Sequence, residues 1–193
     1  PEVGEKIVRL LRALDVAVDF PPGQTCCGMP LFNSGYHRDA AEVARRTVRL
    51  FEGSAAVIVP SGSCAWMVKH EYPHLLEHDD EWRGRAQQLA RRTFEFSDFL
   101  VNQLQVLDVG ARFAGTVAYH FACHLRMLGQ TNEVERLIQH VAGAKYVALN
   151  RQDQCCGFGG SFAIRYPHIS GNMVDDKTRC ILVSGADCVV STD

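Results

Sequence analysis

Six cysteines lie in short segments whose residue types suit the binding of a soft metal. Residues 26–28 and residues 155–157 both read Cys-Cys-Gly, and each triplet follows an apolar segment. Cys64 and Cys123 also follow apolar runs, at the points where a strand would end. The candidate cofactor and metal ligands are therefore Cys26, Cys27, Cys64, Cys123, Cys155 and Cys156.

Two adjacent cysteines are a poor disulfide pair, because the small ring strains the peptide bond between them. Adjacent thiolates repel each other, and a bound cation removes that repulsion. Thiolate sulfur selects iron-sulfur clusters, zinc or cuprous copper over hard cations. The glycine after each pair allows a sharp turn and the close approach of a bulky inorganic group. The pattern predicts two sulfur-ligated sites and leaves the metal open.

Other residues carry weaker signals. His120 and His124 flank Cys123 and suggest zinc, but alternation along a strand also explains them as one core and one surface residue. Cys180 falls on an expected helix face and Cys188 inside an expected strand. A single buried cysteine usually acts as a small apolar residue, so we expect both to be packing residues.

The elements that must position the six cysteines alternate between helix and strand. Apolar spacing predicts helices over 3–14 and 38–51, and β-branched runs predict strands over 16–20 and 55–60. A serine of the segment "SGSC", residues 61–64, is expected to cap a helix that begins near Cys64. The second part of the chain repeats this order, with strands expected over 116–121, 145–150 and 188–192 and helices over 132–141 and 171–184.

The repeated order predicts the fold class. We expect an α/β protein of two similar tandem halves, related by a pseudo-two-fold, with short, mainly parallel sheets and helices on both faces. The predicted domains are residues 1–95 and residues 96–193. Residues 70–92 are polar and are expected to form an exposed helix and linker, followed by a helix over 97–107. Loops at the carboxyl ends of parallel strands meet at one edge, which would gather the cysteines.

Composition narrows the function classes. The 193 residues are 47% hydrophobic and 22% charged, with a formal net charge of -2, so no basic face for nucleic acid is expected. No apolar run approaches the roughly 20 residues of a membrane span, and no signal peptide is recognisable. Eight cysteines in a chain of ordinary core composition indicate reduced thiols and a cytoplasmic location.

Several longer motifs resemble a known family. They are "GQTCCGMPLFNSGY", "PSGSCAWMV", "YHFACHLR", "QCCGFGGSFA" and "SGADCVVSTD". They are similar to the duplicated cysteine-rich CCG domains found in the heterodisulfide reductase family and in the iron-sulfur subunit of glycolate oxidase. They look most like the lactate utilization protein A branch, and the resemblance covers nearly the whole chain.

The resemblance implies a [4Fe-4S] cluster in each repeat, which in the reductase branch is a noncubane pair. Cys26, Cys27 and Cys64 would serve the first site, and Cys123, Cys155 and Cys156 the second. The reductase pattern ends each site with a second cysteine, whereas this chain has Met67 there. Mapping the repeat places one further cysteine before Pro1 and one after Asp193, so incomplete clusters are expected within these residues.

The resemblance further implies a non-flavin, electron-transfer subunit of a complex that oxidises L-lactate to pyruvate. Its implied partners are a ferredoxin-like iron-sulfur subunit and a third subunit. Residues 157–161, "GFGGS", lack the pattern of a P-loop or a dinucleotide fingerprint. Two alternatives stay open: a thiol-disulfide redox enzyme like heterodisulfide reductase, and a structural domain stabilised by zinc. No catalytic residue is assigned.

Overall fold

The computed structural model describes residues 2–193. The first part of the chain contains α1 (Glu2–Ala13), α2 (Met29–Asn33), α3 (His37–Leu50), β1 (Val57–Val59), α4 (Gly62–Trp66), the π-helix η1 (Met67–Glu71), α5 (Tyr72–Leu75), α6 (Arg83–Arg91) and β2 (Thr93–Glu95). The second part contains α7 (Phe96–Asp98), the π-helix η2 (Phe99–Gln103), β3 (Arg112–Tyr119), α8 (Cys123–Met127), α9 (Glu133–Gln139), β4 (Ala142–Val147), α10 (Ser161–Arg165), α11 (Pro167–Ser184) and β5 (Cys188–Val190).

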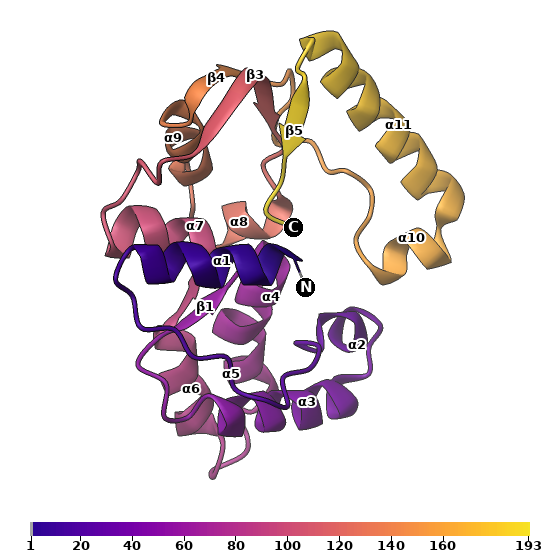
Figure 1. The fold of residues 1–193 in the computed structure, drawn as a ribbon. Coiled ribbons are helices and arrows are strands. Elements are labelled where there is room, and N and C mark those ends of the chain that lie inside the picture. The colour runs from indigo at the N-terminus through magenta and orange to yellow at the C-terminus, as the bar shows by residue number, and fades with distance from the viewer. Residues whose placement is uncertain (1) are drawn as a thin grey trace.

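Two parallel sheets organise these elements, which confirms the predicted α/β class. β1 pairs with β2, and Val57 lies opposite Thr93. In the second sheet the order is β4-β3-β5, and both pairs are parallel. In Figure 1 the three-stranded sheet lies at the top with α9 beside it, and α1 crosses the middle of the molecule above α3 and α6. The boundary between the halves at residue 95 stays a prediction.

Each half has its own core, and a third cluster lies between them. In the first half the small residues Ala40, Ala44 and Val48 on one face of α3 are buried in a cluster to which α5 and α6 contribute. In the second half Val117, Tyr119, Leu125, Val134 and Ile138 form a core between the sheet and helices α8 and α9. The third cluster joins α1 to η2, through Leu11, Phe99 and Leu100. The halves are therefore fixed to each other by apolar packing.

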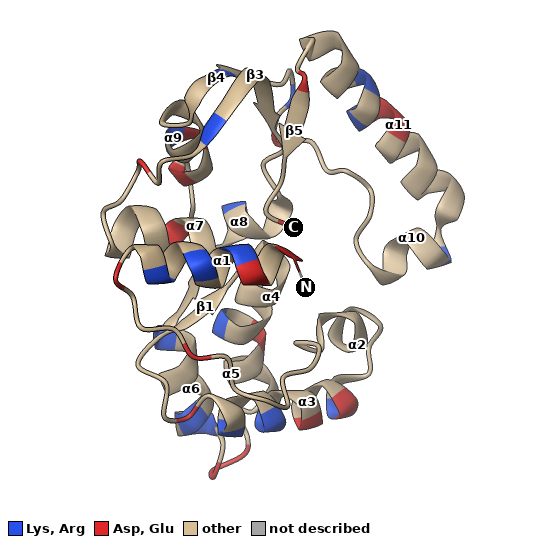
Figure 2. Cartoon of the chain, viewed as in Figure 1, with Lys and Arg blue, Asp and Glu red and all other residues tan. Residues whose placement is uncertain are grey.

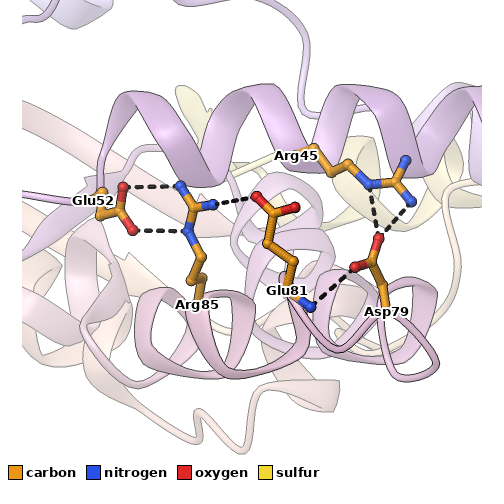
Figure 3. A network of polar contacts seen from close by, with 5 residues as sticks. All are labelled: Arg45, Glu52, Asp79, Glu81 and Arg85. Atoms are coloured by element: carbon orange, nitrogen blue, oxygen red, sulfur yellow. Dashed lines mark hydrogen bonds and ion pairs between the residues drawn. The ribbon is translucent and has the colours of Figure 1, made fainter.

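The expectation of an exposed linker over residues 70–92 is wrong. Tyr72, Leu76, Trp82 and Leu89 from this segment are buried in the first core. Their apolar side chains are separated by charged residues, so the average polarity of the segment hides the buried face. Charged residues also hold the segment, as Figure 3 shows: Arg45 of α3 binds Asp79, and Arg85 binds Glu52, just after α3, and Glu81 within the segment.

Two further expectations need correction. The segment 16–20 forms no strand in the described chain. Val16 and Val18 instead pack, partly buried, into the cluster between the halves. The helix expected over 97–107 is shorter than predicted. It consists of α7 followed by the π-helix η2, and it ends at Gln103. The other predicted helices and strands are present, with ends shifted by a few residues.

Figure 2 shows charged residues along the outer sides of α3 and α6, whereas α10 is almost free of them. One band of acidic and basic residues crosses the middle of α11. Across residues 2–193, none of the helices combines the length and the apolar character needed to cross a membrane.

The two Cys-Cys-Gly turns have matching geometry. Gly28 has φ 88° and Gly157 has φ 84°, a left-handed conformation that favours glycine. In each turn the glycine N–H donates to the sulfur of the first cysteine at 3.4 Å. Each glycine also lies against the following long helix, Gly28 beside Val43 of α3 and Gly157 beside Met173 of α11. The internal repeat therefore extends to backbone conformation and packing.

Replacing Gly157 with Ala should destabilise the fold. A β-carbon there would lie 2.6 Å from Met173 Cβ and 2.8 Å from the Ser170 carbonyl oxygen, in addition to the cost of a positive φ. We expect the free energy of unfolding to fall by about 2–4 kcal/mol, measured by urea denaturation. The matched control is Gly171→Ala within α11, where nothing lies within 4 Å and helix propensity should raise stability by about 1 kcal/mol. Equal stabilities of the two variants would contradict this account of the turn.

Candidate metal centre

The structure brings Cys27 and Cys64 together. Cys64 lies in the first turn of α4, where the Ser61 side chain caps the helix by accepting a hydrogen bond from the Cys64 N–H at 3.4 Å. Cys27 comes from the first Cys-Cys-Gly turn, and its Sγ donates to Cys64 Sγ at 3.1 Å. The predicted cap thus places one candidate ligand against another from a separate loop.

The contact makes the two thiols unequal. The hydrogen bond from Cys27 lowers the pKa of Cys64 to about 7. The same contact, together with burial, raises the pKa of Cys27 above its usual range. Cys64 is therefore the thiol that ionises first, and a thiolate is the form of cysteine that binds metals and attacks electrophiles.

A hydrogen bond from a buried tyrosine holds the turn that carries Cys27. The Tyr72 hydroxyl donates to the Cys27 carbonyl oxygen at 2.8 Å, and burial raises the pKa of Tyr72, which keeps it a donor. Cys26 is exposed, and its sulfur accepts a hydrogen bond from the Gly28 N–H. Within the described residues, Cys26 has no hydrogen bond to Cys27 or Cys64.

Residues from the second half cap the helix that carries Cys64. Asp193 accepts hydrogen bonds from the Ser63 N–H at 2.9 Å and from the Ser61 and Ser63 hydroxyls at 2.8 and 2.7 Å. Burial raises the pKa of Asp193, but the hydrogen bonds from His124, Ser63 and Ser61 outweigh it and lower the pKa to about 2. The carboxylate is thus ionised under ordinary conditions.

The halves meet closely at the same point. The Gly62 N–H donates to the Thr192 carbonyl oxygen at 3.0 Å. A β-carbon on Gly62 would lie 3.1 Å from Leu125 Cγ of α8. His124 of α8 lies 3.6 Å from Asp193, so in this structure it pairs with a carboxylate. The Cys64 helix is therefore positioned by both halves.

The second set of cysteines is less closely assembled. Cys123 begins α8, and Arg126 Nη2 donates to its sulfur at 3.5 Å. Arg126 also lies 3.7 Å from Asp153, just before the second Cys-Cys-Gly turn. In the part of the chain that the structure describes, no hydrogen bond between sulfurs joins Cys123, Cys155 and Cys156. Their predicted convergence stays a prediction.

His120 lies near the second set. Its Nδ1 is buried without a hydrogen-bond partner among the described residues. Burial lowers the pKa of His120, and the charges of Lys177 and Arg126 lower it further, so the ring is neutral near pH 7. A direct role as a ligand stays a hypothesis from the sequence for both His120 and His124.

A polar network that the sequence did not predict lies beneath the second turn. The Lys177 ammonium group is buried and donates to backbone carbonyls of residues 151 and 152. Arg151 donates to Cys180 Sγ at 3.1 Å and pairs with Asp176. Cys180 is buried as predicted, but its sulfur contacts a guanidinium group. The only sequence signal was a lysine and a cysteine three positions apart on α11.

The donor chemistry at the first turn fits a thiophilic metal or an iron-sulfur cluster. All eight cysteines of the described chain are free, and a cavity of about 240 Å³ is lined by Cys27, Cys64, Thr47 and Val57. Soft thiolates at the edge of such a cavity suit iron and zinc equally. Among residues 2–193, no three His, Cys, Asp or Glu side chains form a group that could hold a metal ion. The structure thus assembles a pair of donors at the first turn.

The sequence of this chain matches a known protein family and several known proteins. The family described as the cysteine-rich domain, CCG, matches residues 1–69 and 117–193. The chain is 45% identical over 192 residues to lactate utilization protein A of Bacillus licheniformis, covering 99% of this chain and 80% of that protein. It is 46% identical over 193 residues to lactate utilization protein A of Geobacillus kaustophilus, covering 100% and 80%.

A third relative is lactate utilization protein A of Bacillus subtilis, which is 43% identical over 192 residues, with 99% of this chain and 80% of that protein covered. The two matched stretches contain both Cys-Cys-Gly turns as well as Cys64 and Cys123. The resemblance predicted from the motifs is confirmed, and the chain belongs to the cysteine-rich CCG domain family.

Proposed function

We propose that this protein is an iron-sulfur electron-transfer subunit of a complex that oxidises L-lactate to pyruvate. The observation that carries the proposal is the approach of Cys27 Sγ and Cys64 Sγ to 3.1 Å, from two separate loops, in a chain with a second Cys-Cys-Gly turn of the same geometry. The substrate is suggested by the lactate utilization proteins to which the chain is similar.

In this proposal Cys26, Cys27 and Cys64 hold the first centre, and Cys123, Cys155 and Cys156 hold the second. An iron-sulfur cluster, when bound, supplies one-electron redox chemistry. The protein's own part is to present soft ligands, to bury them and to tune them by nearby hydrogen bonds. Tyr72 anchors the first turn, and the Ser61 and Asp193 caps fix the helix that carries Cys64.

We also propose partner subunits and a cellular location for this chain. The partners are a ferredoxin-like iron-sulfur subunit and a third subunit, which would exchange electrons with this chain. We propose a cytoplasmic location, where thiols stay reduced and available for metal. The halves divide near residue 95, so each carries one Cys-Cys-Gly turn.

A second candidate function is thiol-disulfide exchange at Cys27 and Cys64, which their contact and the lowered pKa of Cys64 favour. The Cys64 thiolate would attack a substrate disulfide and release one thiolate, leaving a mixed disulfide. Cys27, after losing its proton, would then attack Cys64 Sγ and release the second substrate thiolate. Two electrons pass to the substrate disulfide, and the protein keeps a Cys27–Cys64 disulfide.

Replacing a ligand cysteine should lower the iron content of the protein. We expect full-length Cys27→Ser and Cys156→Ser, purified without oxygen, each to lose iron and visible absorbance relative to the parent, because hydroxyl oxygen is a poor ligand for iron in a sulfur site. Cys188→Ser is the matched control and should keep the parent's iron, since Cys188 lies in strand β5. Iron and acid-labile sulfide are measured per chain. The assignment is contradicted if Cys188→Ser loses iron while the other two keep it, or if the parent holds zinc alone.

The reactivity of Cys64 should depend on pH in the metal-free protein. Because a pKa of about 7 lies below the usual thiol value of 9.0, its alkylation by iodoacetamide should rise through about pH 7 as the thiolate forms. In Cys27→Ala the midpoint should move upward, since the donor to Cys64 is removed. Rates at Cys64 are followed by peptide mass spectrometry, with Cys188 as the internal comparison. An unchanged midpoint in Cys27→Ala would show that the contact does not set the pKa.

A further inference from the structure

Lys177, a buried cation on α11, binds the loop that precedes the second Cys-Cys-Gly turn. Lys177 is only 3% exposed, and its Nζ donates to the carbonyl oxygens of Gln152 at 2.9 Å and Arg151 at 3.2 Å. Arg151 has φ 54°, a left-handed conformation rare for residues other than glycine. A backbone held in this conformation needs partners that fix it, and Lys177 provides two hydrogen bonds.

Side chains of the same loop add to this attachment. Arg151 pairs with Asp176 at 3.1 Å and donates to Cys180 Sγ at 3.1 Å. Gln154 Nε2 also donates to Asp176. On α11, Lys177 directly follows Asp176 and lies three residues before Cys180. The loop and the helix therefore form one unit.

The ammonium group of Lys177 lies close to the second Cys-Cys-Gly turn, because it binds the carbonyl oxygens of residues 151 and 152, a few residues before Cys155. The pKa of Lys177 is lowered, chiefly by burial, and Cys180, Cys156 and Asp153 offset only part of that effect. A buried ammonium group is unfavourable unless negative groups or hydrogen bonds compensate it. Iron bound by several thiolates carries net negative charge, and such a centre would compensate Lys177 in a surrounding of low dielectric constant.

At the first Cys-Cys-Gly turn, the cation that binds the preceding loop is exposed rather than buried. Arg46 of α3 donates to the carbonyl oxygen of Gly23 at 3.3 Å, but Arg46 is exposed to solvent. Water screens an exposed charge, so Arg46 should act only weakly on Cys26 and Cys27. Near Cys64 the charged group is the Asp193 carboxylate. The two halves repeat their backbone but differ in the charge around their cysteines.

We infer that Lys177 is the positioning residue of the second cysteine loop, and that its buried positive charge equips the second centre, in contrast to the first, to carry additional negative charge. The part concerning the centre rests on the proposed function. The part concerning the loop rests on contacts of the chain alone. Lys177 should thus influence both the order of residues 151–157 and the reduction potential of the centre that Cys156 helps to hold.

The test compares Lys177→Met with Lys177→Arg, which keeps the charge, and with Arg46→Met, which removes the exposed cation. In the anaerobically purified full-length protein, the midpoint potential of the centre lost in Cys156→Ser should shift to more negative values in Lys177→Met. It should stay near the parent's in Lys177→Arg and in Arg46→Met. Should Lys177→Met not fold, Lys177→Gln takes its place.

A second measurement uses the metal-free protein. Amide hydrogen exchange over residues 151–157 should accelerate by at least about tenfold in Lys177→Met and recover in Lys177→Arg, because the loop loses its anchor. If the parent binds no iron, the proposed function fails, and this exchange measurement alone decides the role of Lys177 in the loop. Parent-like potential and exchange in Lys177→Met would overturn the inference, as would identical behaviour of Lys177→Arg and Lys177→Met.

Discussion

The contact between the thiols of Cys27 and Cys64 sets the requirements for the rest of the first half. Two sulfurs 3.1 Å apart can share a proton, but two thiolates at that distance repel each other strongly. Cys64 accordingly has a pKa of about 7, whereas that of Cys27 is raised. A soft cation would allow both to ionise, and for this reason the pair suits the start of a metal centre. Both loops must then be held rigidly, which the Tyr72 hydrogen bond and the Ser61 cap accomplish.

The same requirement explains how the halves are joined. The helix that carries Cys64 is capped by Asp193 and accepts the close approach of α8 at Gly62. A cluster of apolar residues from α1 and η2 closes the space between the halves. Movement of one half against the other would disturb the Cys64 cap, so the geometry of the first turn depends on the second half. The second turn depends on contacts within its own half, chiefly those of Lys177 and Arg151 with α11.

Much of the fold could be predicted because its signals are local. β-branched runs identified the strands that became β1, β3, β4 and β5, and the serines of residues 61–63 indicated a capped helix at Cys64, which Ser61 proves to cap. Residues 16–20 have strand-like composition but pair with no strand among residues 2–193, and pairing cannot be read from one segment alone. Residues 70–92 were misjudged because Tyr72, Leu76 and Trp82 are buried between charged neighbours. The cap by Asp193 and the burial of Lys177 could not be predicted, because they depend on segments that meet only in the folded chain.

The central claim is that these cysteines hold iron through sulfur. X-ray absorption at the iron and zinc edges of the full-length protein, purified without oxygen, tests it most directly. We expect an iron edge whose fine structure shows sulfur neighbours and a second shell of iron, the pattern of a cluster. A zinc edge with four sulfur neighbours and no iron would contradict the claim and would identify the cysteines as ligands of a structural zinc site.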